Sequence, residues 1–506
     1  MRSRDFIITK LLGDYSVLPA MLLGLALRII NINSPVLGVH SWRQADTASI
    51  ARNFYVNGMD FFSPQIDWGG ASSGLVGSEF PLYSYLVALS YKIFGFSEIL
   101  ARGISVLFSC LTILLIYQLT KHYFGVKPAF WSALLYSFLP IPVYYGRTIQ
   151  PEALMMFLAA LSLERWLAFL ESKDNIHLFV SWLAFTLAVL VKAIPLIWLG
   201  LPILITAIQQ GVVKEIRFNL LVLASLVLSI LWYTHAYNLF QSTGLSFGIW
   251  GANHGRFSLS MPFQLEYWSN LTVRIMLRNL LILGFPLFIL GAKPWRLNNI
   301  FILGLFSVLI GGAMNPQSFS VHEYYQLPMM LFFCPLMGMG VVRLQDKVLK
   351  NNLLGFRFLL ASLLVGSIFM LQIDYWMMEN KSVNPVWTNA KLIESATDPD
   401  SLVVSVTGGD PTLLYLANRK GWVIPPESVN IQSIRNWKDK GANYISGSWQ
   451  VIESYQSFSD LKLKARLRNT LCPQNSQGEI NTVHTYLDNK SCSISSENFL
   501  IPLNNF

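Results

Sequence analysis

A carboxylate that could act as a base stands in a short polar stretch of a chain that is otherwise poor in charge. Only 13% of the 506 residues are charged. A helix over residues 44–57 would place Asp46, Ser49 and Asn53 on one face, because they recur at intervals of three and four. A carboxylate on that face, near a dry cleft, could accept a proton from a hydroxyl group. The alternative is a local ion pair between Arg43 and Asp46, worth a few tenths of a kcal/mol.

A second acid, Glu79, ends the long polar loop that begins near Asn33. The chain returns there to an apolar region, where a carboxylate is costly unless it is paired. Glu79 could therefore bind a metal ion or orient an acceptor molecule. The alternative is a cap on a helix that starts at Pro81, because acids favour the first turn of a helix.

Three cations fall at the predicted outer ends of apolar segments: Arg102, Arg147 and Lys192. This placement opposes the usual excess of Lys and Arg in cytoplasmic loops. Arginine clamps a phosphate with two N–H groups, and lysine meets it as a point charge. Together the three cations predict an anionic ligand, whereas any single one could simply extend toward lipid headgroups.

A last polar cluster runs from His322 to Tyr325, at the predicted outer start of a span. Tyrosines at a membrane interface usually act as anchors. His322 and Glu323 would supply only two metal ligands, which is a weak basis for a metal site. We expect this cluster to hydrogen-bond a sugar or a phosphate. Nothing in the sequence requires a metal, and a divalent ion remains an open alternative.

These residues must be positioned by membrane helices, because 53% of the chain is hydrophobic and the mean hydropathy is +0.45. Backbone groups in lipid need internal hydrogen bonds, so the spans are predicted to be helical. Residues 81–94 are predicted to form an amphipathic segment at the interface. The pattern shows neither repeated halves nor broken helices. About eleven spans are predicted from the length rule, at residues 15–32, 98–119, 127–143, 150–170, 176–191, 194–209, 217–236, 271–290, 298–314, 324–342 and 354–373.

The distribution of Lys and Arg predicts which side each loop occupies. Basic residues precede the first span and recur in alternate loops, so the N-terminus is predicted to be cytoplasmic. Residues 33–79, 237–270 and the tail after about residue 375 are then outside. Basic cytoplasmic loops account for the net charge of +9, so we predict no nucleic-acid partner. The sequence has no glycine-rich phosphate loop and no zinc-type cysteine spacing.

The tail differs in composition from the rest and predicts a small extracytoplasmic α/β domain over residues 376–506, after a membrane domain over 1–375. Residues 402–406 and 421–424 are predicted strands, and a Gly-Gly turn leads into a helix through Leu416. That turn is more often structural than a ligand site. Outside the cell, Cys472 and Cys492 could form a disulfide. Cys110 and Cys334 lie in apolar segments and are expected to be inert.

The chain resembles the polyprenyl-phosphate-dependent GT-C glycosyltransferases, in particular the bacterial branch of the protein O-mannosyltransferases and the lipid A aminoarabinose transferase. The likeness covers roughly residues 10–375. Each motif is short, but their order and sidedness together are specific. The motifs are Ile50-Ala51-Arg52, Ser78-Glu79-Phe80-Pro81, Ala101-Arg102, Arg147 with Gln150-Pro151-Glu152, Val191-Lys192-Ala193 and His322-Glu323-Tyr324-Tyr325-Gln326-Leu327-Pro328.

The resemblance implies the GT-C fold and an inverting transfer from a polyprenyl-phosphate sugar at the outer face of the bacterial plasma membrane. The first-loop acid would be the base. Where the family has an Asp-Glu pair, this chain has Arg43-Gln44, and Asp46 lies one turn further on the same helix face. Phe80 stands where the family has a lysine, so the phosphate contacts fall to Arg102, Arg147 and Lys192.

The predicted partners are a polyprenyl-phosphate-linked sugar, an acceptor lipid, glycan or protein, and membrane lipids. Two other classes stay open: a lipid-linked sugar flippase or other transporter, and a non-catalytic assembly subunit. Asp46 and Glu79 are the predicted catalytic residues. The predicted substrate- and phosphate-binding residues are His40, Arg43, Arg52, Arg102, Arg147, Glu152, Lys192, His322, Glu323 and Tyr325.

Overall fold

The structure is a computed structural model whose described residues form two compact units. The first, called here the helical unit, holds the described residues up to Ile32, then Glu79–Tyr237 and those from Gly248 to Tyr375. The second, the mixed unit, holds Asn33–Ser78, Asn238–Phe247 and the described residues from Trp376 onward. The described residues are 16–248, 258, 260–296, 299–347, 352–382, 384–448, 493–494 and 498–503.

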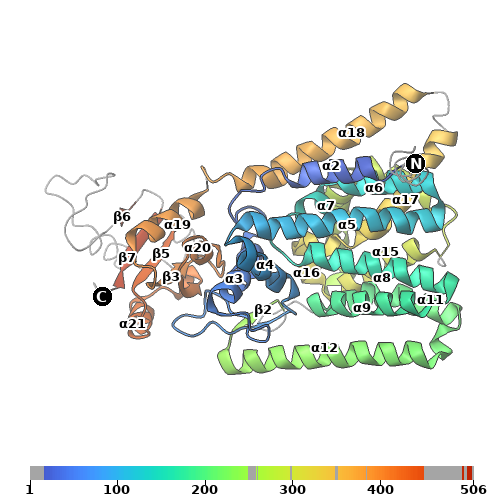
Figure 1. Cartoon of the computed structure of the whole chain (residues 1–506). Helices are drawn as coiled ribbons and strands as arrows, with labels where there is room; N and C mark the ends of the chain where they lie inside the picture. The colour runs from blue at the N-terminus through green and yellow to red at the C-terminus, as the bar shows by residue number, and fades with distance from the viewer. Residues whose placement is uncertain are drawn as a thin grey trace, which may run out of the picture. The chain divides into compact units, whose positions relative to one another are not determined.

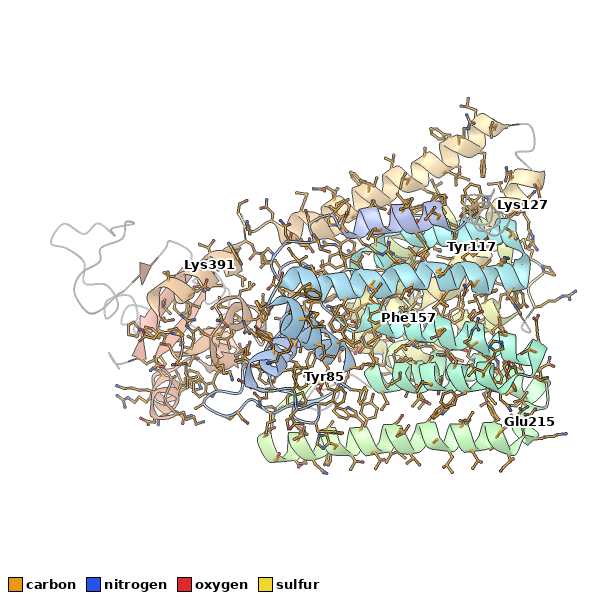
Figure 2. All side chains as sticks on the ribbon, viewed as in Figure 1. Tyr85, Tyr117, Lys127, Phe157, Glu215 and Lys391 are labelled. Atoms are coloured by element: carbon orange, nitrogen blue, oxygen red, sulfur yellow. The ribbon has the colours of Figure 1, made fainter. Side chains whose placement is uncertain are left out.

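Helices make up the helical unit, and the long helices α5, α8 and α9 run side by side in it (Figure 1). Phe157 of α8, labelled in Figure 2, packs against Phe108 of α5 with ring centroids 5.3 Å apart. The helices, of which α12 runs on into the mixed unit, are α2 (Leu18–Arg28), α4 (Leu82–Phe94), α5 (Glu98–Phe124), α6 (Val126–Phe138), α7 (Pro140–Tyr145), α8 (Glu152–Ser172), α9 (Asn175–Val191), α10 (Pro195–Trp198), α11 (Gly200–Gln209), α12 (Ile216–Thr243), α13 (Leu265–Arg274), α14 (Gly284–Ala292), α15 (Ile300–Met314), α16 (Pro316–Val321), α17 (Met329–Lys347) and α18 (Leu353–Leu371). Single-turn helices include η3 (Ile275–Asn279), η4 (Glu323–Gln326) and η5 (Gln372–Trp376).

Most predicted spans coincide with helices, which confirms a polytopic helical membrane protein. Among the described residues, α5, α8, α12, α17 and α18 with its continuation are long and apolar enough to cross a membrane. A bent pair would add a sixth, and four shorter apolar helices stand beside them. The predicted number of about eleven spans stays a prediction.

The span predicted at residues 271–290 is broken, and the expectation of no broken helix was wrong. Helix α13 with η3 meets α14 at an angle of 99°. Leu281 and Ile282 at the break have positive φ values of 51° and 59°, which side chains of this size rarely adopt. Packing therefore imposes the break. In the sequence, Gly284 and Pro286 were the residues that could have indicated a break in this span. Gly284 also packs closely, because an added Cβ would lie 2.6 Å from the Met337 side chain.

A fully buried arginine joins four helices of the helical unit. Arg28 Nε donates to Ser109 Oγ at 2.7 Å, and its Nη1 donates to the carbonyl oxygen of Ser137 at 2.9 Å. Its Nη2 donates to the carbonyl oxygen of Pro142 at 3.0 Å. Cations inside membrane segments are usually satisfied in this way by polar partners. The contacts fix α2 against α5, α6 and α7, just before the turn that carries Arg147.

The mixed unit combines α3 (Ser41–Asn57) with a five-stranded sheet, of order β4-β3-β5-β7-β6. Strand β3 pairs in parallel with β4 and β5, and β7 pairs antiparallel with β5 and β6. The predicted strands and the helix through Leu416 are confirmed, while Cys472 and Cys492 lie outside the described residues. The elements are β3 (Leu402–Val406), β4 (Lys420–Ile424), β5 (Tyr444–Ser448), β6 (Ser493–Ile494), β7 (Asn498–Pro502), α19 (Pro385–Ala396), α20 (Thr412–Leu416), α21 (Ile431–Asp439), and the separate parallel pair β1 (Gly77–Ser78) and β2 (Ser246–Phe247).

The first polar loop packs against the edge strand of this sheet. The Gly421 N–H of β4 donates to the carbonyl oxygen of Asp67 at 3.0 Å. The Gly70 N–H donates in turn to the carbonyl oxygen of Gly421 at 2.7 Å. The loop thereby satisfies backbone groups that an edge strand otherwise leaves open. Residues far apart in the sequence thus fold as one unit.

Replacing Gly421 by alanine is expected to destabilise the mixed unit. Its φ is +157°, and a Cβ atom would lie 1.8 Å from the carbonyl oxygen of Val403. Backbone strain of this kind costs about 1–3 kcal/mol, and displacing β3 adds to it. Thermal unfolding of the purified full chain measures the effect. Gly103→Ala is the matched control, because no atom lies within 4 Å of its added Cβ. Equal melting temperatures for the two variants would contradict the expectation.

Candidate active site

Asp46 projects from the second turn of α3 into the interior of the mixed unit. The helix begins after His40, which has a left-handed φ of 54° and whose carbonyl oxygen accepts the N–H groups of Arg43 and Gln44. The Asp46 side chain is buried, with 4% of the residue exposed. The indole Nε1 of Trp68 donates to its Oδ1 at 2.8 Å. The predicted helix is confirmed, and its polar face is buried.

Burial dominates the electrostatics of this carboxyl group. It raises the pKa of Asp46 to about 8, against the opposing effects of the Trp68 hydrogen bond and the Arg43 cation. The negative charges of Asp410 and Asp67 act in the same direction as burial. The guanidinium of Arg43 lies 4.6 Å from the ring centroid of Phe247. With that pKa, the carboxyl group of Asp46 is mostly protonated at neutral pH and ionises as the pH rises through about 8.

Arg52 binds the loop and the C-terminal part of the mixed unit. Its Nη2 is 2.5 Å from Asp67 Oδ2, and its Nη1 donates to the carbonyl oxygen of Tyr415 at 3.2 Å. The guanidinium also lies 4.6 Å from the Tyr415 ring centroid. Asn53 Nδ2 donates to the other oxygen of Asp67 at 3.1 Å. Asp67, which the sequence analysis did not single out, thus links two side chains of α3.

In the helical unit, three residues predicted from separate motifs meet at one point. The Lys192 ammonium forms an ion pair with Glu152 Oε1, and both side chains are almost completely buried. The Lys192 Nζ atom lies 4.4 Å and 4.5 Å from the ring centroids of Tyr324 and Tyr325. Aromatic faces attract a desolvated cation. The cation is therefore balanced by one carboxylate and two rings, in a narrow cleft also lined by Asn315.

The end of α9 that carries Lys192 is fixed by its neighbours. The Phe80 N–H donates to the carbonyl oxygen of Leu190 at 3.2 Å, and the Tyr233 hydroxyl donates to that of Val189 at 3.0 Å. Glu79, buried beside Phe80, is held next to the same helix end. Helix α4 has Pro81 as its N-cap, without a side-chain cap.

Arg102 and Arg147 are fully buried in the helical unit. The Arg147 Nη1 donates to the carbonyl oxygen of Asn31 at 3.3 Å. A chain of hydrogen bonds joins the turns that carry these arginines: Tyr83 and Ser105 hydroxyls are 2.8 Å apart, and Ser105 Oγ donates to the carbonyl oxygen of Thr148 at 2.7 Å. The two segments that carry the arginines are thus joined by hydrogen bonds.

Sequence reasoning missed Arg278, which is partly exposed and forms a second cluster with the buried Glu323. Its Nη1 lies 2.5 Å from Glu323 Oε2, and its Nε lies 2.9 Å from Asp374 Oδ2. The Tyr145 hydroxyl donates to Glu323 Oε1 at 3.0 Å. The neighbouring His322 stacks on Tyr324, with ring centroids 5.3 Å apart. A charged residue inside a predicted span was the available signal, because such residues need a partner.

Among the residues that the structure describes, no group of three or more His, Cys, Asp or Glu side chains could hold a metal ion. Glu323 is engaged by Arg278 and Tyr145. Of the cysteines, Cys334 is buried and Cys110 is half-buried, and both are free thiols.

Two sequence comparisons match parts of the chain. Residues 78–237 match the family model described as Dolichyl-phosphate-mannose-protein mannosyltransferase. An uncharacterized protein of Aquifex aeolicus (strain VF5) is 33% identical over 113 residues, which cover 22% of this chain. The match spans 23% of that curated relative.

Solved structures match nearly the whole chain at low identity. ArnT from Cupriavidus metallidurans in the apo state has a TM-score of 0.63 at 14% identity, covering 96% of this chain and 97% of ArnT. The same protein bound to undecaprenyl phosphate has a TM-score of 0.63 at 13% identity, and the match covers 96% of this chain and 98% of ArnT. The oligosaccharyltransferase AglB from Archaeoglobus fulgidus has a TM-score of 0.53 at 13% identity, and the match covers 85% of this chain and 69% of AglB. The resemblance seen in the sequence is thereby confirmed: the chain has the GT-C fold of these glycosyltransferases, and its residues 78–237 match the dolichyl-phosphate-mannose-protein mannosyltransferase family model.

Proposed function

We propose that the chain is a membrane glycosyltransferase that moves a sugar from a polyprenyl-phosphate carrier to a lipid, glycan or protein acceptor. The observation that carries this proposal is the fold shared over 96% of the chain with ArnT, whose structure contains undecaprenyl phosphate. The match of residues 78–237 to a mannosyltransferase model supports it. The reaction would take place at the outer face of the bacterial plasma membrane, with the N-terminus in the cytoplasm and the C-terminus outside.

The predicted base, the three cations and two further side chains each have a role in this reaction. Asp46 takes the proton of the acceptor hydroxyl, whose oxygen then attacks the anomeric carbon of the sugar. The bond from that carbon to the phosphate oxygen breaks, and polyprenyl phosphate leaves. Arg102, Arg147 and Lys192 stabilise the charge on the leaving phosphate. Glu79 and His322 orient the acceptor.

The rate is expected to depend on pH through Asp46. Burial raises the pKa of Asp46 to about 8, and only the ionised carboxylate can take a proton. The value of kcat/KM should therefore rise with pH and level off above about 8, since it reports the ionisation of the free enzyme. Initial rates at acceptor concentrations well below KM, measured across that pH range, give kcat/KM and test this. A profile that falls with rising pH through neutrality would contradict Asp46 as the base.

The proposed activity can be tested with the full chain in lipid nanodiscs. A panel of radiolabelled polyprenyl-phosphate sugars is supplied with lipid, glycan and peptide acceptors, and release of polyprenyl phosphate is followed. Release that depends on both the chain and an acceptor supports the transferase. Absence of release across the panel, with sugar lipid crossing the bilayer of liposomes that contain the chain, would replace the transferase with a transporter.

The break between α13 and α14 is the observation that favours a transporter as the second candidate. Transporters commonly use discontinuous helices near the middle of the membrane, and this pair bends by 99°. The liposome arm of the experiment addresses it directly. Transport that survives substitution of Asp46 and requires no acceptor would favour this second candidate.

A further inference from the structure

Trp68 contacts the carboxylate of Asp46, and the segment that carries Trp68 is bound to the sheet. The indole donates to Asp46 Oδ1 at 2.8 Å. On either side of Trp68, Asp67 and Gly70 are hydrogen-bonded through their backbones to Gly421 of β4, at 3.0 Å and 2.7 Å. The segment that bears the indole is thus fixed at two points on the edge strand.

The contact between this loop and β4 is tight. Gly70 has a φ of +66°, and a Cβ atom there would lie 2.5 Å from the indole of Trp422. Any larger residue at this position would therefore collide with the Trp422 ring, and its backbone would be strained in the left-handed region. Arg52 secures the same loop from the other side through Asp67. The orientation of Trp68, and with it that of Asp46, therefore depends on residues that follow the last membrane helix.

Asp410 brings a second influence from the same sheet. It follows the Gly408-Gly409 turn after β3, and its Oδ1 accepts the N–H of Thr412 at 2.8 Å at the start of α20. Helix α20 packs against α3, where Arg52 donates to the carbonyl oxygen of Tyr415. The carboxyl group of Asp410 is largely buried, and burial raises its pKa.

We propose that Trp68 and Asp410 are positioning residues for Asp46, which makes the C-terminal α/β segment part of the catalytic apparatus. The proposal rests on the proposed function, in which Asp46 is the base. Trp68 stabilises the ionised form through its hydrogen bond, whereas the negative charge of Asp410 opposes it. The other charged groups that act on Asp46 are Arg43, which favours the ionised form, and Asp67, which opposes it.

Two substitutions should therefore shift the pH profile of kcat/KM in opposite directions. Trp68→Phe keeps the ring and removes the donor, so the rise should move to higher pH by about one unit. Asp410→Asn keeps an acceptor for the Thr412 N–H and removes the charge, so the rise should move to lower pH. A purely structural role would lower the rate without moving the profile. Asp400→Asn, an exposed acid that precedes the same strand, is the control and should match the wild type.

The experiment uses the full chain in nanodiscs and the polyprenyl-phosphate sugar that the wild type turns over. Opposite shifts support the proposal, and two unshifted profiles overturn it while the transferase stands. If the wild type releases no polyprenyl phosphate, the proposed function has failed instead. Trp68→His restores an N–H donor and should return the profile toward that of the wild type. Should Trp68→Phe not fold, the shift in Asp410→Asn alone decides.

Discussion

Replacing Asp46 by asparagine is expected to lower the rate of sugar transfer by about 10²–10⁴-fold, the usual contribution of a general base. Asparagine has the same shape and can still accept the Trp68 hydrogen bond, so helix α3 should be unchanged. The measurement is release of polyprenyl phosphate by the full chain in nanodiscs at about pH 8, where the wild-type carboxyl is half ionised. An undiminished rate in this variant would remove Asp46 from the mechanism.

The same substitution should change how stability depends on pH. The pKa of Asp46 is about 8 in the folded chain and close to 4 in an unfolded one. Between these values the unfolded chain releases a proton that the folded chain keeps, so wild-type stability falls as pH rises from about 4 to about 8. Asp46→Asn lacks this fall and should melt at a higher temperature than the wild type at alkaline pH. Asp400→Asn is the control and should follow the wild type at every pH.

Breaking the buried ion pair is expected to have the largest effect on stability. Glu152→Gln leaves the Lys192 ammonium buried without its counter-charge, and removal of one partner from such a pair costs about 3–5 kcal/mol. Lys192→Met removes the cation that pairs with the buried Glu152 carboxylate and should also destabilise the fold. The double variant contains neither charge, so it should recover much of the lost stability. It should remain inactive, because the proposed phosphate contact of Lys192 is gone.

An exposed ion pair in the same chain supplies the control for these measurements. The Lys391 Nζ atom lies 2.5 Å from Glu394 Oε2, and nearly half of each side chain is exposed. Glu394→Gln should change the free energy of unfolding by less than about 1 kcal/mol. If Glu152→Gln and Glu394→Gln lowered the free energy of unfolding equally, the ion pair of Glu152 and Lys192 would behave as a solvated one. Recovered activity in the Glu152 and Lys192 double variant would exclude Lys192 from phosphate binding.

Helices were predictable because each is a local pattern of apolar residues. The predicted span at 98–119 lies within α5, and the strand at 402–406 coincides with β3. The helix that carries Asp46 was predicted from spacing alone. Local patterns, however, say nothing about which distant helices meet, so the meeting of Glu152, Lys192 and Tyr325 at one point could not be derived.

The features that the sequence analysis missed have different physical causes. Arg278 was counted as part of an apolar span, because its partners Glu323 and Asp374 come from other helices. The break after η3 was missed because its two left-handed residues are ordinary apolar ones. Asp67 was not considered, although its carboxylate forms an ion pair with Arg52, which stays a predicted substrate-binding residue. Trp68 gave no signal, since a tryptophan in a polar loop has many ordinary roles.

The pairing of the first loop with β4 sets the order in which the chain can mature during synthesis. Roughly 320 residues separate Ser78 from Leu402, and ribosomes add about 5–20 residues per second. Helix α3 and its loop would therefore wait on the order of half a minute before their partners emerge. A nascent chain that stops before Leu402 has Asp46 and Trp68 but no strand to hold them. The base would thus reach its final geometry only late in synthesis, after the last membrane helix has been made.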